Sequence, residues 1–166
     1  MEPMGNSSFL LQLQAWNQRW FATHKGKRNK LDLEKANREI EYGMKKAGAD
    51  PFNESPWRYI VALVQEQHVV LNGALSLESQ DIIAKCDMEI TKIRQELREV
   101  TGENTGVESK ELLSAYVDIL EMKQSDEGYT AAVDIARSLG KNHDPIRVKY
   151  WKLREDEMLS NIQADS

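Results

Sequence analysis

The chain has 166 residues, 40% of them hydrophobic and 30% charged, so we expect one domain with a well-solvated surface. A formal net charge of −5 argues against a general nucleic-acid binder and against a protein that coats anionic membranes. The single cysteine excludes a disulfide framework and fits a reducing compartment, and the sequence shows neither a signal peptide nor an apolar run of ~20 residues. We therefore expect a cytoplasmic protein with no membrane span and no nucleic-acid partner.

Glycines divide the chain into segments that we predict to be helices. Residues 32–47 place apolar side chains at steps of three and four, which is typical of one face of an amphipathic helix. Ser55 is predicted to cap the next helix, with Pro56 in its first turn, where a missing N–H costs nothing.

Residues 79–100 carry the clearest helical signal. Six side chains alternate steps of three and four: Ile83, Cys86, Ile90, Ile93, Leu97 and Val100. This stripe suits a coiled coil or a helical hairpin, and the hairpin is favoured because the stripe covers fewer than three heptads. Further helices are predicted at residues 109–123, at 127–139 and after Pro145, before a polar tail at 159–166. Because no segment shows the period-two alternation of a strand, we predict an all-α chain of about seven helices.

Two tryptophans suggest an internal repeat. Trp16 and Trp57 each lie near the start of a predicted helix, and about 40 residues separate them, which is the length of one unit in helical solenoids. The helix-loop-helix segment between them favours this interpretation over a chance pair.

The residues that could carry chemistry do not form a recognisable set. His24, His68 and His143 do not stand at metal-ligand spacing from one another or from Cys86. Cys86 lies within an apolar stripe, so we predict a small core residue rather than a nucleophile.

Charged residues are predicted to be solvated. Glu39 with Glu41 and Asp156 with Glu157 are expected on solvated helix faces. One basic cluster surrounds Gly26 and consists of Lys25, Lys27, Arg28 and Lys30. It could bind an anion or an acidic partner, but a solvated loop between helices is favoured. Composition and spacing therefore predict a helical-repeat protein that offers a binding surface rather than a self-sufficient enzyme.

Four segments resemble a known family. Residues 50–59 (DPFNESPWRY) resemble the repeat signature of protein prenyltransferase α subunits, in which an Asn and a small hydroxyl residue precede a Trp that opens a helix. Residues 15–21 (AWNQRWF) resemble the preceding repeat, and residues 38–42 (REIEY) resemble the helix that joins the two. Residues 144–151 (DPIRVKYW) resemble the closing helix of the α subunit shared by protein farnesyltransferase and type I geranylgeranyltransferase, which favours that subunit over its Rab-specific relative.

The resemblance covers residues 15–158 and implies a right-handed α-α superhelix of tetratricopeptide-like hairpins that wraps a β subunit. It implies that the heterodimer transfers farnesyl or geranylgeranyl from its diphosphate to the cysteine of a C-terminal CaaX motif. Zinc, with magnesium as a second candidate, would be supplied through the β subunit, and we expect the isolated chain to be inactive. The alternative is a non-catalytic helical-repeat adaptor or a truncated product.

The N-terminal segment departs from the family pattern. The family's upstream repeats, and a diphosphate-binding Lys on one of them, have no counterpart before Asn6. Residues 9–14 intervene between Asn6 and Trp16, so residues 1–14 are predicted to be an atypical segment. The resemblance places Asn6 near the active-site cleft and makes it a candidate substrate-proximal residue.

Other motif residues are candidates for the partner interface or for packing between repeats: Trp16, Asn17, Arg19, Asn53, Trp57 and Tyr59. Packing is favoured for both tryptophans because a Trp buries a large apolar area wherever it lies. Arg19 could pair with a carboxylate of the next repeat or reach the partner. Asn53 is predicted to cap a helix, and Trp151 with Tyr150 to seal the last hairpin.

Overall fold

The computed structural model describes residues 4–25 and 30–164, with side chains described for residues 10–25 and 30–162. Within these residues the chain forms seven α-helices: α1 Met4–His24, α2 Leu33–Ala49, α3 Glu54–Gln67, α4 Leu77–Thr101, α5 Lys110–Met122, α6 Asp126–Ser138 and α7 Val148–Ala164. The predicted all-α class is confirmed.

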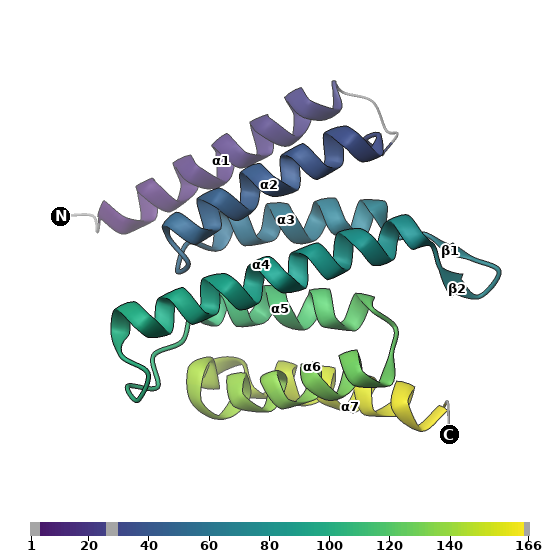
Figure 1. Ribbon diagram of the computed structural model, residues 1–166. Coiled ribbons are helices and arrows are strands. Elements are labelled where there is room, and N and C mark those ends of the chain that lie inside the picture. The colour runs from purple at the N-terminus through teal and green to yellow at the C-terminus, as the bar shows by residue number, and fades with distance from the viewer. Residues whose placement is uncertain (1–3, 26–29, 165–166) are drawn as a thin grey trace.

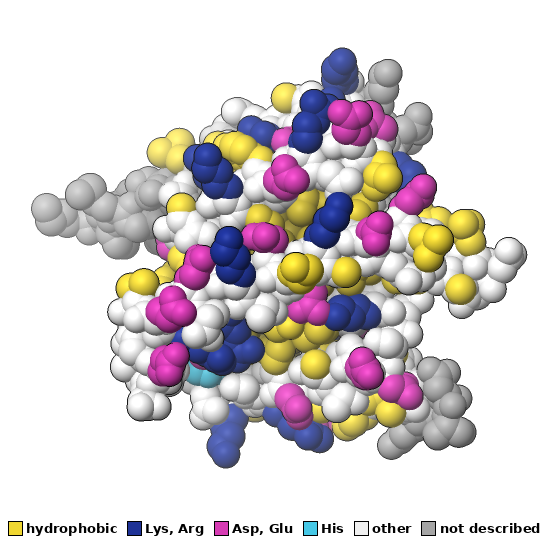
Figure 2. All heavy atoms as spheres, in the orientation of Figure 1, with side chains coloured by type: hydrophobic (Ala, Val, Ile, Leu, Met, Phe, Trp, Pro, Cys, Tyr) yellow, Lys and Arg dark blue, Asp and Glu magenta, His cyan; other side chains and the backbone are white. Residues whose placement is uncertain are grey.

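The helices form a stack of antiparallel hairpins, with α1 at one end and α6 and α7 at the other (Figure 1). The pairs α2–α3, α4–α5 and α6–α7 pack as hairpins, and α3 contacts α5, which joins the first pair to the second. This arrangement is the superhelix of helical hairpins that the sequence predicts. Side chains of both charge signs cover the face that α2 and α4 present, and hydrophobic patches lie between them (Figure 2).

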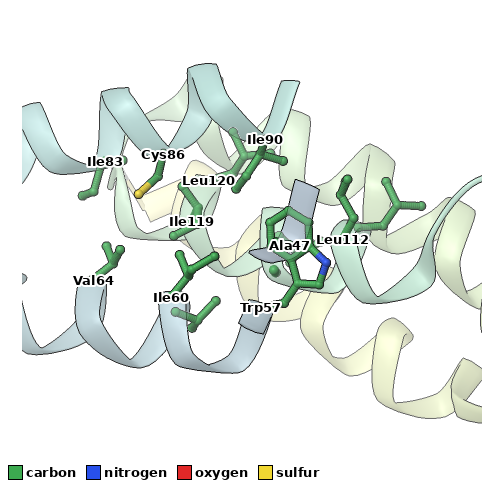
Figure 3. Packing of buried hydrophobic residues seen from close by; sticks show 14 of the residues in the cluster. Ala47, Trp57, Ile60, Val64, Ile83, Cys86, Ile90, Leu112, Ile119 and Leu120 are labelled. Atoms are coloured by element: carbon green, nitrogen blue, oxygen red, sulfur yellow. The ribbon is translucent and has the colours of Figure 1, made fainter. Parts of the chain in front are cut away.

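The core follows the line of contact between successive hairpins. Trp57 and Ile60 of α3 lie against Leu112 and Ile119 of α5, and all four side chains are at most 1% exposed (Figure 3). The indole N–H of Trp57 donates to the carbonyl oxygen of Pro51 at 2.9 Å. The hydroxyl of Ser109 donates to the same oxygen at 2.6 Å, so the turn before α3 is tied directly to the start of α5.

Polar side chains cap most of the helix starts. Ser109 caps α5 by accepting the backbone N–H of Leu112. The cap predicted at Ser55 is wrong, because α3 begins earlier and the side chain of Asn53 accepts the backbone N–H of Ser55 at 3.1 Å. Ser55 is therefore inside the first turn, where its hydroxyl is buried without a hydrogen-bond partner among the described residues.

A short β-hairpin contradicts the prediction that the chain has no strands. β1 (Val70–Leu71) pairs antiparallel with β2 (Ala74–Leu75). The turn residues Asn72 and Gly73 have φ values of 52° and 80°, which a two-residue hairpin turn requires. Strands of two residues are too short to show the alternation of apolar and polar residues that marks a strand. An Asn-Gly pair between apolar residues does, however, indicate a hairpin turn.

The C-terminal segment is more regular than predicted. A π-turn, η1 (Leu139–His143), and a 3-10 turn, η2 (Pro145–Arg147), precede α7. Helix α7 continues to Ala164, so most of the predicted polar tail at 159–166 is helical. Helix α1 likewise runs through the predicted boundary at residue 14. Trp151 is 1% exposed and donates to the carboxylate of Asp144 at 2.9 Å, whereas Tyr150 lies at the surface edge of the hairpin.

Two glycines of α2 provide a matched test of this packing. A Cβ added to Gly43 would lie 2.7 Å from Cγ1 of Ile60, whereas one added to Gly48 would lie 3.6 Å from Ile93, an ordinary contact. We expect Gly43→Ala to lower the free energy of unfolding by about 1–3 kcal/mol because the core is overpacked. Gly48→Ala should leave it unchanged or raise it by up to about 1 kcal/mol through helix propensity. Denaturant unfolding measures both, and equal effects would contradict the packing of α2 on α3.

Candidate functional site

Three of the candidate residues, Trp16 and Arg19 of α1 and Tyr59 of α3, meet around the carboxylate of Glu39 in α2. This side chain is buried, and the residue is only 8% exposed, so its predicted place on a solvated face is wrong. Ala36 and Gly43 are buried on the same helix, three residues before Glu39 and four residues after it. That spacing places Glu39 on the apolar face of α2, so the burial of Glu39 could have been predicted from the sequence.

Four hydrogen bonds hold the Glu39 carboxylate. Arg19 donates to both oxygens, from Nε to Oε1 at 3.1 Å and from Nη2 to Oε2 at 2.7 Å. The hydroxyls of Thr23 and Tyr59 donate to Oε1 at 2.9 Å and 2.7 Å. A buried carboxylate needs such partners because removing it from water without them is costly. The structure therefore pairs Arg19 with a carboxylate of the next helix.

Aromatic rings enclose this group of charges. The ring of Trp16 lies 4.9 Å from that of Tyr59 and 5.8 Å from that of Tyr42, centre to centre. The guanidinium of Arg19 lies 3.4 Å above the ring of Tyr42. We call Trp16, Arg19, Glu39, Tyr42 and Tyr59 the Glu39 cluster. Its contacts join α1 to both helices of the first hairpin.

The electrostatics of the Glu39 cluster fix its protonation. Burial would raise the pKa of Glu39, but the hydrogen bonds from Arg19, Tyr59 and Thr23 outweigh burial and lower it. Burial, reinforced by the hydrogen bond to Glu39, raises the pKa of Tyr59 to about 12. Glu39 is thus ionised and Tyr59 protonated at neutral pH. A carboxylate that already accepts four hydrogen bonds is a poor general base, so the cluster is suited to holding helices in place rather than to proton transfer.

The remaining candidate residues lie apart from the cluster. Asn53 donates to the side chain of Gln12 at 2.8 Å and so links the start of α3 to α1. Trp57 points into the core between α3 and α5. Asn17 is exposed on α1, and its side chain makes no hydrogen bond with the described residues. The backbone of Asn6 belongs to α1, but its side chain lies outside the described residues.

The basic cluster is only partly described. Lys25 and Lys30 are exposed, while Lys27 and Arg28 lie outside the described residues.

The described side chains do not fit a zinc site. Nowhere among them do three or more His, Cys, Asp or Glu side chains converge as metal ligands would. Both ring nitrogens of His24 are engaged, Nδ1 with the carbonyl of Trp20 at 2.8 Å and Nε2 with the carboxylate of Glu66 at 2.9 Å. Burial raises the pKa of the Cys86 thiol to about 12, with the charges of Glu89 and Asp87 adding to the effect, and its residue is 1% exposed.

Comparison with known proteins gives one informative likeness. No protein-family model matches the sequence. The chain is similar to the protein farnesyltransferase/geranylgeranyltransferase type-1 subunit alpha of Solanum lycopersicum, with 27% identity over 119 residues. The aligned region covers 70% of this chain and 33% of the tomato protein, so the chain matches about a third of that relative's length. This likeness supports a relationship to prenyltransferase α subunits. Over the described residues, no helix combines the length and apolarity that a bilayer crossing needs.

The charge of Glu39 is expected to stabilise the fold in a pH-dependent way. Glu39→Gln should lower the free energy of unfolding at pH 7 by about 1–3 kcal/mol, because charged hydrogen bonds to a buried group are lost. The pKa of Glu39 is lower in the folded state than its ordinary value of 4.5. The difference between the two proteins should therefore be complete above that pH and shrink as the pH falls below it.

Denaturant unfolding between pH 3 and pH 7 measures this difference. Glu41→Gln is the matched control, since Glu41 is exposed and makes no ion pair among the described residues, and it should change the free energy by less than about 0.5 kcal/mol. Equal losses for the two variants, or a loss that does not change with pH, would show that Glu39 does not act through its charge.

The buried thiol of Cys86 should be inert in the native protein. At pH 8, a thiol such as Cys86 with a pKa near 12 is almost entirely protonated, and only the thiolate reacts. We expect a disulfide reagent to modify the native chain far more slowly than the chain in denaturant, where one thiol should react at once. Rapid reaction of the native chain would mean that α4 opens away from the core.

Proposed function

We propose that this chain is the C-terminal part of the α subunit of a heterodimeric protein prenyltransferase. The observation that carries the proposal is the 119-residue likeness to the tomato α subunit. Two structural features support it. The chain is a stack of helical hairpins, as the family resemblance implies, and Asn53 caps the helix in which Trp57 lies one turn further on, as the family's repeat signature requires.

In this proposal the chain acts as a scaffold. Its candidate chemical groups are already engaged: Glu39 by four hydrogen bonds, His24 through both ring nitrogens, and Cys86 by burial. The β subunit would supply the zinc and the lipid pocket. In the heterodimer, the sulfur of a CaaX cysteine would form a bond to C1 of the isoprenoid diphosphate as the diphosphate departs. The choice between farnesyl and geranylgeranyl would rest with the β subunit.

Asn17 is the residue that best separates an interface role from packing. Trp16, Arg19, Trp57 and Tyr59 all make contacts inside the chain, so their replacement would disturb the fold and the interface together. Asn17 is exposed and its side chain makes no hydrogen bond with the described residues, so Asn17→Ala should leave the fold intact. A weaker complex with this variant would place its side chain at the interface.

The proposal is tested by co-expression with the β subunit of tomato farnesyltransferase, followed by size-exclusion chromatography and a farnesylation assay on a CaaX peptide with zinc. We expect a 1:1 complex, and we expect the isolated chain to be inactive. The β subunit of type I geranylgeranyltransferase should also bind, whereas that of the Rab enzyme serves as the control and should not.

The outcomes separate the hypotheses. A complex with activity would mean that residues 1–166 suffice to support catalysis. A complex without activity would make the chain a docking part of the subunit. If neither CaaX-type β subunit binds, the prenyltransferase proposal fails and the helical-repeat adaptor becomes the better hypothesis. Zinc-dependent farnesylation by the isolated chain would contradict the scaffold role.

A further inference from the structure

The turn of the β1–β2 hairpin has a chemical reactivity beyond its role in the fold. Asn72 is the one asparagine of the chain that a glycine follows. Asparagine is thermolabile because the backbone nitrogen of the next residue can attack its side-chain carboxamide. A side chain on that next residue crowds the attacking nitrogen, and Gly73 has none. The sequence therefore places the most favourable pair for this reaction in the hairpin turn.

Both reacting groups are accessible. Asn72 and Gly73 are exposed, and the hairpin projects beyond the ends of α3 and α4 (Figure 1). A Cβ added to Gly73 would meet no atom within 4 Å, so the space beside this residue is open. Neither the carboxamide of Asn72 nor the backbone N–H of Gly73 forms a hydrogen bond with the described residues. No bond of this kind has to break before the two groups meet.

The turn can change its conformation at low cost. Asn72 has a φ of 52° in the closed turn, and its backbone must rotate to bring the carboxamide over the next nitrogen. The strands β1 and β2 have two residues each, and Leu71 is 60% exposed. A hairpin this short buries little surface, so its tip opens readily without unfolding of the helices.

Two other asparagines provide the contrast. Asn104 is also exposed in a loop, but the next residue, Thr105, is β-branched. The backbone N–H of Thr105 moreover donates to the carbonyl of Gly102 at 3.2 Å. The carboxamide of Asn53 is held by two hydrogen bonds, one through its oxygen and one through its nitrogen. Neither site offers the freedom of the hairpin turn.

We propose that Asn72 is a modification site, at which the chain converts spontaneously to aspartate and isoaspartate. The backbone nitrogen of Gly73 gives its proton to solvent hydroxide and bonds to Cγ of Asn72. The bond between Cγ and the side-chain nitrogen breaks, and ammonia departs. Water then opens the resulting succinimide ring. Cleavage of the new bond to Cγ gives aspartate, and cleavage of the original peptide bond gives isoaspartate.

The products alter the tip of the hairpin. Either one adds a negative charge to residues 69–77, which otherwise carry no charged side chain. Isoaspartate also lengthens the main chain by a methylene group and so disturbs the pairing of Leu71 with Ala74. The base of the hairpin stays anchored, because the hydroxyl of Ser79 accepts the backbone N–H of Val69 at 2.9 Å. This inference concerns the chain itself and does not depend on the prenyltransferase proposal.

The test incubates the full chain in buffer at pH 7 and at pH 8. Anion-exchange chromatography separates the acidic products, and mass mapping of a digest locates each carboxamide that has become a carboxylate. We expect conversion at Asn72 to be about tenfold or more faster than at Asn104, which is about 1.4 kcal/mol in activation free energy. The rate should rise with pH, because the attacking nitrogen must lose its proton. Chromatography of the Asn72 peptide should resolve both aspartate and isoaspartate.

Two variants separate the chemistry from the turn. Gly73→Asn keeps a residue that tolerates a positive φ but adds a Cβ beside the attacking nitrogen. It should slow conversion at Asn72 by about tenfold. Asn104→Gln is the matched control, since it removes an exposed loop asparagine outside the hairpin, and Asn72 should then convert at the wild-type rate.

Several results would overturn the proposal. These are a rate at Asn72 no higher than that at Asn104, or a rate in Gly73→Asn within about twofold of the wild type. Aspartate without isoaspartate would mean direct hydrolysis of the amide and no succinimide. Conversion in urea but not in the native chain over the same period would show that the closed turn protects Asn72.

Discussion

The fold depends on the need of each helical hairpin to bury an apolar face that it cannot bury alone. A pair of amphipathic helices covers the surface between them but leaves the outer side of each helix to a neighbour. Here α3 provides that neighbour for α5, and Trp57 with Leu112 fills the space between them. Burial of such large side chains contributes several kcal/mol each, at about 25 cal/mol per Å² of apolar surface. The junctions between hairpins therefore contribute to the stability of the stack together with the packing inside each hairpin.

The Glu39 cluster shows what burial of an apolar helix face requires when that face carries an ionised side chain. Placing a carboxylate on the apolar face of α2 would cost several kcal/mol if it were left unpaired. The chain meets this requirement with two donors from Arg19 and one each from Thr23 and Tyr59, drawn from the two helices on either side. Such an arrangement tolerates only one relative placement of α1, α2 and α3. Its chemical consequence is that the hydrogen-bonding capacity of the buried Glu39 carboxylate is taken up by side chains of the chain itself.

Much of the architecture follows from local patterns in the sequence. The steps of three and four in residues 32–47 locate α2 to within two residues, because an amphipathic helix leaves its period in the sequence wherever it lies. The Glu39 cluster could not be predicted in the same way, since Arg19 and Tyr59 each lie 20 residues from Glu39 and meet it only through tertiary packing. The burial of Glu39 could be predicted, because Glu39 shares a helix face with Ala36 and Gly43. Its hydrogen-bond partners could not be predicted from the sequence. The start of α3 was misplaced for a different reason: Asn53 and Ser55 are both good caps, and propensity alone does not decide between them.

The carbonyl oxygen of Pro51 joins two hairpins through a single atom. It accepts the indole N–H of Trp57 from its own hairpin and the hydroxyl of Ser109 from the next one. Fraying of the turn before α3 would therefore release the N-cap of α5 at the same time, and loss of α5 would weaken the anchor of Trp57. In a linear array of repeats, contacts shared by neighbouring hairpins couple the unfolding of one hairpin to that of the next. Strong coupling makes neighbouring hairpins unfold together. The central hairpins should accordingly behave as one cooperative folding unit in hydrogen exchange, even though each is a separate structural repeat.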